Sequence, residues 1–307
     1  MAFHNNISIM GDNICRIMEE FMGLSFYKKK KKKKKLWIFL LILVIAVLGA
    51  ACWMFKVKKE EREQAAAKKR EERTVRVTIP EGYTAELVAQ KLEKQDVCKA
   101  EDFLKAANDL DGYSYDWIKS IPEKAKTNYK LQGFLFPDTY EVYKHTDAKK
   151  IVGMMLNNFN TKWEQISKDG KNSLTPYEIV TLASVVEREA KVDSEYAKIS
   201  GVIYNRLDKK MKLQIDATVL YPLTGGKYNK KRTLYKDLEV DSPYNTYKYQ
   251  GLPAGPICNP GANALRAAVS PQKNSYLYYH TDKTGEGTHI FSETFSQHQK
   301  SLENQSK

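Results

Sequence analysis

A run of twenty residues without a charge, 36–55, dominates the hydrophobic pattern of the chain. As a helix it would be about 30 Å long, which matches the hydrocarbon thickness of a bilayer. Trp37 and Trp53 lie near its two ends, where indole rings prefer the membrane interface. The pattern therefore predicts one transmembrane helix. The alternative is a cleaved signal peptide or a lipoprotein signal ending at Cys52, but the apolar residues continue past the small residues at 50–51.

Beyond this segment the chain becomes charged and then amphipathic. Residues 56–73 are strong helix formers without an apolar face, which predicts a charged helical stalk. Residues 74–79 alternate between polar and apolar types and predict a strand, and a turn follows at 80–82. Thr84 can then cap a short amphipathic helix. We expect these elements to form a small βα module over 74–125.

The remaining residues, 126–307, alternate helical segments with short strands and should form a larger mixed domain. Its predicted helices are 148–168, 176–190 and 195–210, and its predicted late strands are 276–280 and 289–291. The two strands flank a Gly-Glu-Gly turn and should pair as a hairpin. The predicted fold class is α+β, with a single N-terminal transmembrane helix, a small module and a larger domain.

The charge of the chain first suggests a nucleic-acid partner, because 50 Lys and Arg outnumber 37 Asp and Glu and give a net charge of +13. Nine basic and three acidic residues in the first 55 positions account for +6 of this charge. The +7 that is left is dispersed over the rest of the chain, with Lys and Glu interspersed. No zinc-finger, RNP or helix-turn-helix signature occurs, so we expect no nucleic-acid partner.

The orientation in the membrane follows from the basic residues around the apolar run. Eight contiguous lysines, 28–35, abut its N-terminal side, whereas the basic residues on the other side are interrupted by acidic ones. Positive residues favour the cytoplasmic side, and long C-terminal domains cross the membrane largely regardless of charge. We expect residues 1–35 in the cytoplasm and 56–307 outside the cell membrane.

The cysteines and histidines show no metal-binding pattern. Cys15 would be cytoplasmic and Cys52 within the membrane, which leaves Cys98 and Cys258 outside. Nothing in the sequence requires these two to be bridged, and two isolated thiols are the simpler expectation. No CxxC, Cys/His cluster or HExxH occurs, so we expect no metal and no cofactor.

The predicted helix 176–190 carries the candidate chemistry. Thr175 and Glu178 form a capping box, and Pro176 occupies the first helical position, which fixes the start of the helix. On a helical wheel, Glu189 falls among large aliphatic residues, whereas Glu187 lies on the opposite flank. A carboxyl held against aliphatic groups has a raised pKa and suits a general acid. Glu189 is therefore the better candidate for a general acid. The alternative is that both residues are ordinary surface glutamates.

Several motifs resemble the YceG-like/MltG family of endolytic murein transglycosylases, in the same order and with similar spacing over most of 74–300. The matching segments are GFLFPDTY (133–140), LASVVEREA (182–190), VIYNRL (202–207), LQIDATVLY (213–221), SPYNTY (242–247) and GLPAGPICNPG (251–261).

The resemblance implies a single-span membrane enzyme that cuts peptidoglycan strands internally, with 74–125 as a LysM-like module. It implies that the catalytic acid is the second Glu of the ExE pair, Glu189, with Glu187 as the alternative. Protonated Glu189 would donate to the oxygen between N-acetylmuramic acid and N-acetylglucosamine. Its carboxylate would then take the proton of the muramyl C6 hydroxyl, which closes on C1 to give a 1,6-anhydro end. Peptidoglycan strands, the membrane and cell-wall synthases are the implied partners.

Supporting roles in sugar binding fall on polar and aromatic residues of the matching segments, each of which could instead fix a loop. Hydrogen bonds to acetamido and hydroxyl groups, or stacking on sugar rings, are the functions expected of Gln214, Asp216, Asn205, Asn245, Tyr247 and Tyr221.

Two other functions fit the same sequence. A hydrolase would use Asp216 as a second carboxylate and water as the acceptor, and would leave reducing muramyl ends. A membrane-anchored wall-binding or divisome scaffold would use the small module and no catalysis. The identity of the glycan ends separates these possibilities.

Overall fold

The structure is a computed structural model, and it describes residues 31–123, 127–170, 173–230, 233–285 and 287–305. The chain divides into two compact units, residues 1–70 and 71–307, which are described separately. The α-helices are α2 (Lys31–Arg73), α3 (Ala85–Lys94), α4 (Ala100–Ala106), α5 (Ala148–Ile166), α6 (Pro176–Glu189), α7 (Tyr196–Asp208), α8 (Asp216–Leu223), α9 (Ala262–Val269) and α10 (Phe295–Asn304). The strands are β1 (Thr74–Thr78), β2 (Thr139–Tyr143), β3 (Tyr278–Thr281) and β4 (His289–Ser292), and the 3-10 helices are η1 (Asp116–Ser120), η2 (Ser167–Asp169), η3 (Asp193–Glu195) and η4 (Tyr235–Glu239).

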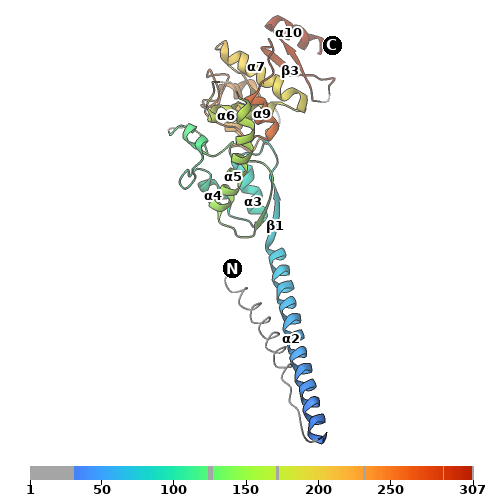
Figure 1. Cartoon of the computed structure of the whole chain (residues 1–307). Helices are drawn as coiled ribbons and strands as arrows, with labels where there is room; N and C mark the ends of the chain where they lie inside the picture. The colour runs from blue at the N-terminus through green and yellow to red at the C-terminus, as the bar shows by residue number, and fades with distance from the viewer. Residues whose placement is uncertain (1–30, 124–126, 171–172, 231–232, 286, 306–307) are drawn as a thin grey trace. The chain divides into compact units, whose positions relative to one another are not determined.

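The first unit contains most of α2, which covers both the predicted span and the predicted stalk in one continuous helix (Figure 1). Within it, Trp37–Ala65 is long and apolar enough to cross a membrane. The large apolar side chains described along this segment are exposed, with Trp37 74% accessible. Such exposure suits a lipid-facing helix and would be unfavourable in water. Most of the predicted cytoplasmic tail, residues 1–30, lies outside the described residues.

In the second unit, β1 pairs with β2 in an antiparallel two-stranded sheet, with Val77 opposite Tyr140. Both side chains point to the buried face, as the alternation of the sequence predicts for β1. Strand β2 lies beyond residue 125, so the predicted small module is completed by chain from the predicted larger domain. Residues 71–307 form one compact unit. The domain boundary at 125 therefore stays a prediction.

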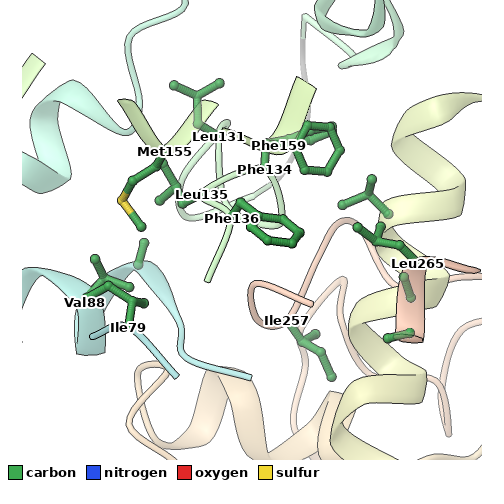
Figure 2. Close-up of a cluster of buried hydrophobic side chains, with 14 of the residues drawn as sticks. Ile79, Val88, Leu131, Phe134, Leu135, Phe136, Met155, Phe159, Ile257 and Leu265 are labelled. Carbon is green, nitrogen blue, oxygen red and sulfur yellow. The ribbon is translucent and has the colours of Figure 1, made fainter. Parts of the chain in front are cut away.

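Among the described residues, one hydrophobic core joins the sheet, α3, α5, α6 and the loop around residue 134. Figure 2 shows part of this core, with Val88 of α3, Phe159 of α5 and Phe134 of the loop. At its centre the ring of Phe134 stacks on Trp117 at 4.5 Å and meets Phe159 edge-on at 5.0 Å. Asn259 is fully buried beside this cluster, where its Oδ1 accepts the backbone N–H groups of Gly133 and Leu135. These hydrogen bonds join the loop around residue 134, which precedes α6 in the sequence, to the loop around residue 259, which follows it.

Helix α6 packs against α7 and α9, which lie beside it in Figure 1. The predicted capping box is present, because Thr175 Oγ1 accepts the N–H of Glu178 and the Glu178 carboxylate accepts the N–H of Thr175. The predicted helices of the larger domain correspond to α5, α6 and α7, each ending within two residues of its predicted end. The α+β class is confirmed.

The C-terminal hairpin is formed by β3 and β4, with Thr281 opposite His289 and Tyr279 opposite Phe291. Helix α10 packs on both strands. The strands are shifted slightly from their predicted bounds, because the Asn274 side chain accepts the N–H of Tyr276 and holds the approach to β3 as a loop. Glu286, in the predicted turn, lies outside the described residues.

Candidate active site

A cavity of about 400 Å³ lies at the C-terminal end of α6. Its wall combines the end of α6, one side chain of α7, the loop before α8 and both strands of the C-terminal hairpin. The lining residues are Glu189, Arg206, Leu213, Gln214, Ile215, Asp216, Tyr247, Tyr279, His280, Thr281 and His289. Polar and ionisable groups dominate this set, as expected for a site that binds a hydroxyl-rich ligand.

Glu189 is the last residue of α6 and the central carboxyl of the cavity. Burial raises its pKa, and the Tyr279 hydroxyl, which donates to Oε2 at 3.0 Å, lowers it in part. The charges of Asp216 and His289 act on it as well, in opposite directions. A carboxyl with a raised pKa, held in one orientation at a cavity wall, has the properties of a general acid.

Glu187 has different surroundings from Glu189 and does not line this cavity. Its Oε2 accepts the backbone N–H of Gly261 at 3.0 Å, at the N-terminus of α9. Burial raises its pKa to about 7, and the nearby Glu81 adds to the shift. Glu187 therefore also has a raised pKa, but its hydrogen bond ties α6 to α9 instead of facing the cavity.

The loop before α8 and the first residue of this helix form the wall that contains Gln214 and Asp216. Gln214 has a left-handed backbone with a φ of 54°, and its N–H donates to Thr246 O. A non-glycine residue in this conformation is uncommon and often found at functional sites. Tyr247 closes the wall by donating its hydroxyl to Asp216 Oδ1 at 2.6 Å. Three of the predicted sugar-binding residues are thus brought together around Glu189.

Arg206, which was not among the predicted site residues, braces two sides of the cavity. Its Nε donates to Leu277 O at 2.6 Å, before β3, and its Nη1 donates to Lys212 O and Leu213 O. The guanidinium therefore holds the loop before α8 at a fixed distance from the hairpin.

The other three predicted sugar-binding residues do not line the cavity. Asn205 Nδ2 donates to Asn274 O and Tyr276 O, and Asn245 Nδ2 donates to the backbone carbonyls at 238 and 240. Tyr221 is fully buried and hydrogen-bonds with Gln132. The structure uses the amide groups of the two asparagines and the hydroxyl of Tyr221 to fix loops or the core, away from the cavity.

Sequence reasoning missed the residues of the hairpin, Tyr279 and His289 above all. Both strands were predicted, but a strand pattern does not say which distant helix the strand will face. Tyr279 meets Glu189 across 90 positions of sequence. The available signal was the presence of tyrosine and histidine side chains on two short strands.

A larger hollow, about 790 Å³, lies between α4 and the turn after β2. Its acidic and basic groups include the exposed pair Lys149–Asp109. Cys98 is among its lining residues, and burial raises the pKa of this thiol to about 11, which leaves it unreactive near neutral pH. Cys98 and Cys258 are both free. Chemical function is therefore better supported at the cavity of Glu189.

Comparison with protein families gives a match to the model of the YceG-like family over residues 28–304, which include α2, α6 and the complete cavity. The chain belongs to the YceG-like family. Two relatives are named endolytic murein transglycosylase. The protein of Bacillus subtilis is 37% identical over 239 residues, and that of Streptococcus pneumoniae D39 is 32% identical over 228 residues.

The match to these YceG-like relatives is partial on their side. It covers 74% of this chain and 64% of the B. subtilis protein, and 68% of this chain and 40% of the S. pneumoniae protein. A crystal structure of a YceG-like protein from Listeria monocytogenes superposes with a TM-score of 0.62 at 37% identity, over 73% of this chain and 75% of the other. The family fold is thus shared over most of the described chain.

Proposed function

We propose that this chain is a membrane-anchored lytic transglycosylase that cleaves peptidoglycan glycan strands internally, between N-acetylmuramic acid and N-acetylglucosamine. The observation that carries the proposal is Glu189, a carboxyl with a raised pKa that the Tyr279 hydroxyl orients in a polar cavity. Membership of the YceG-like family and the names of the two relatives point to the same substrate. The cleavage supports cell-wall assembly.

The chemistry proposed for the cavity starts from protonated Glu189. Its proton passes to the bridging oxygen as the bond from this oxygen to muramyl C1 breaks. The positive charge that develops at C1 is stabilised by the substrate's own acetamido group or by the ring oxygen. The muramyl C6 hydroxyl then bonds to C1 and loses its proton, which gives a 1,6-anhydro end without consuming water. One carboxylic acid suffices, in contrast to the two that hydrolysis by general acid and base needs.

Asp216 is the residue that keeps hydrolysis open as a second candidate, because it lines the same cavity and raises the pKa of Glu189 by its charge. Its Oδ1 already accepts the Tyr247 hydroxyl. We assign Asp216 to sugar binding together with Gln214 and Tyr247, and hydrolysis is the outcome that the product analysis below can reveal.

Digestion of purified glycan strands by the full-length chain in detergent tests the proposal. We expect mass spectrometry to find 1,6-anhydromuramyl ends and a rapid fall in mean strand length, because cleavage is internal. Reducing muramyl ends in their place would assign the protein as a hydrolase, and a muramidase digest provides that reference. Intact strands would favour a non-catalytic wall-binding or divisome scaffold.

The proposed location is the cell membrane, with a single pass through α2, residues 1–35 in the cytoplasm and 56–307 outside. The apolar helix supports the anchor, and the lysines at 28–35 support the direction. Protease should be added to intact cells in which nothing outside the cell membrane blocks its access. It should degrade a C-terminal epitope and leave an N-terminal epitope protected. Protection of the C-terminal epitope until the cells are lysed would reverse the orientation.

We further propose that 74–125, completed by β2, acts as a LysM-like module that holds glycan near the cavity, and that cell-wall synthases are partners. The paired strands and the short helices α3 and α4 support the first suggestion. The second rests on the proposed cleavage, because a cut inside a strand sets the length of the strands that synthases make.

A further inference from the structure

A buried histidine–carboxylate pair near Glu189, formed by His289 and Glu195, is not used by the chemistry described so far. His289 Nδ1 lies 2.7 Å from Glu195 Oε2, and the two side chains are 6% and 7% exposed. The backbone N–H of His289 donates to the other oxygen, Oε1, at 2.9 Å. Both oxygens of one carboxylate are therefore bound to one histidine, which fixes the position of its ring.

These two hydrogen bonds to Glu195 also fix the tautomer of His289. A carboxylate can only accept hydrogen bonds, so the ring nitrogen that faces Glu195 is the protonated one. The other nitrogen, Nε2, keeps its lone pair in the neutral ring. His289 lines the cavity, and no hydrogen-bond partner for Nε2 is found among the described residues. The structure thus provides a proton acceptor at the cavity wall.

The second histidine of the cavity, His280, differs in this respect. Its Nε2 lies 2.6 Å from Ser301 Oγ, and its Nδ1 lies 3.2 Å from Thr281 O. Both of its ring nitrogens are therefore engaged with protein groups. Of the two, His289 is the one available to a substrate.

Tyr279 connects His289 to Glu189. The ring of Tyr279 meets the ring of His289 edge-on with centroids 5.4 Å apart, and its hydroxyl donates to the Glu189 carboxylate. A buried carboxylate bound to a neutral imidazole is an inefficient way to stabilise a fold, because the desolvation of its charge offsets much of what its hydrogen bonds contribute. Its placement beside a candidate acid therefore points to a role in the reaction.

Resting on the proposed transglycosylase function, we propose that His289 is a second catalytic residue, the base that takes the proton of the muramyl C6 hydroxyl, and that Glu195 is its positioning residue. As the C6 oxygen bonds to C1, its O–H bond breaks and the proton moves to Nε2. Glu195 stabilises the imidazolium that forms. The imidazolium then returns this proton through the open cavity to the Glu189 carboxylate, so both groups regain their starting states. This division differs from the sequence-based expectation that one carboxyl performs both transfers.

The decisive variant is Glu195→Gln, which preserves size and can still accept the His289 N–H through its amide oxygen. Its amide N–H₂ would donate to Nδ1 and move the ring proton to Nε2, which removes the acceptor. We expect kcat on glycan strands to fall by on the order of 10- to 100-fold with little change in KM. The fraction of reducing ends should rise, because water captures C1 when ring closure is slow.

His289→Gln should reproduce both effects, and free imidazole should restore anhydro ends to His289→Ala but not to Glu189→Gln. His298→Gln is the matched control, because this histidine packs on Tyr278 outside the cavity. Wild-type kcat and product ratio in Glu195→Gln and His289→Gln would overturn the inference and leave the transglycosylase intact. Exclusively reducing ends from the unmodified protein would overturn both proposals.

Discussion

Glu189→Gln should lower kcat for glycan-strand cleavage by on the order of 10²- to 10⁴-fold, the usual contribution of a general acid. The amide keeps the size of the side chain and can still accept the Tyr279 hydroxyl, so the cavity should keep its shape. It has no acidic proton to give to the glycosidic oxygen. Product formation from purified strands by the full-length chain, followed by mass spectrometry at saturating substrate, measures the effect, and strand binding should change little.

Glu187→Gln is the matched control on the same helix, two residues away. It should retain most of the activity, since Glu187 faces Gly261 and not the cavity. Loss of cleavage in this variant, with full activity in Glu189→Gln, would transfer the acid role to Glu187.

The pH dependence of activity and that of thermal stability separate the role of Glu189 in catalysis from the role of Glu187 in stability. Glu189 acts in its protonated form, so activity should fall as pH rises through its raised pKa. Protonated Glu187 is favoured in the folded state, so its contribution to stability is present below the ordinary carboxyl pKa and lost as pH rises toward about 7. Glu187→Gln should remove this loss, seen as a smaller fall in the thermal midpoint between pH 5 and pH 7, and should keep the activity profile.

Local signals predicted α3, α5, α6, α7, β1, β3 and β4, because the causes of these elements lie within a few residues, whereas β2, α4, α8, α9 and α10 were not predicted. The capping box of Thr175 and Glu178 fixes the start of α6, and the wheel places Glu189 beside aliphatic groups. The apolar part of α2, long enough to cross a membrane, follows from the length of one apolar run. In each case the side chains that determine the element are neighbours in sequence.

The composition of the candidate site could not be predicted to the same extent. Asn245 and Gln214 are equally suitable for sugar binding by residue type, yet the amide of Asn245 donates to the backbone carbonyls of a neighbouring loop. Only the tertiary structure decides which polar group forms hydrogen bonds within the protein and which stays available to a ligand. Likewise, Tyr279 and His289 reach α6 and η3 only through the packing of the C-terminal hairpin.

Gly133→Ala should destabilise the second unit by about 4 kcal/mol. A Cβ at this position would lie 2.6 Å from Pro256 Cβ and 2.7 Å from Val180 Cγ1. The φ of 91° adds backbone strain, so overpacking and strain of about 1–3 kcal/mol each combine. In a unit of this size, the thermal midpoint should fall by roughly 8–16 °C.

Gly251→Ala separates these two contributions. Gly251 has nearly the same backbone, with a φ of 90°, but nothing lies within 4 Å of its Cβ position. This variant should show the strain alone, about 1–2 kcal/mol or roughly 2–8 °C in the thermal midpoint. The difference between the two midpoints then measures how tightly Gly133 packs against Pro256 and against Val180 of α6. Equal losses in both variants would mean that this contact yields easily, and that α6, with Glu189 at its end, is held mainly by α7 and α9.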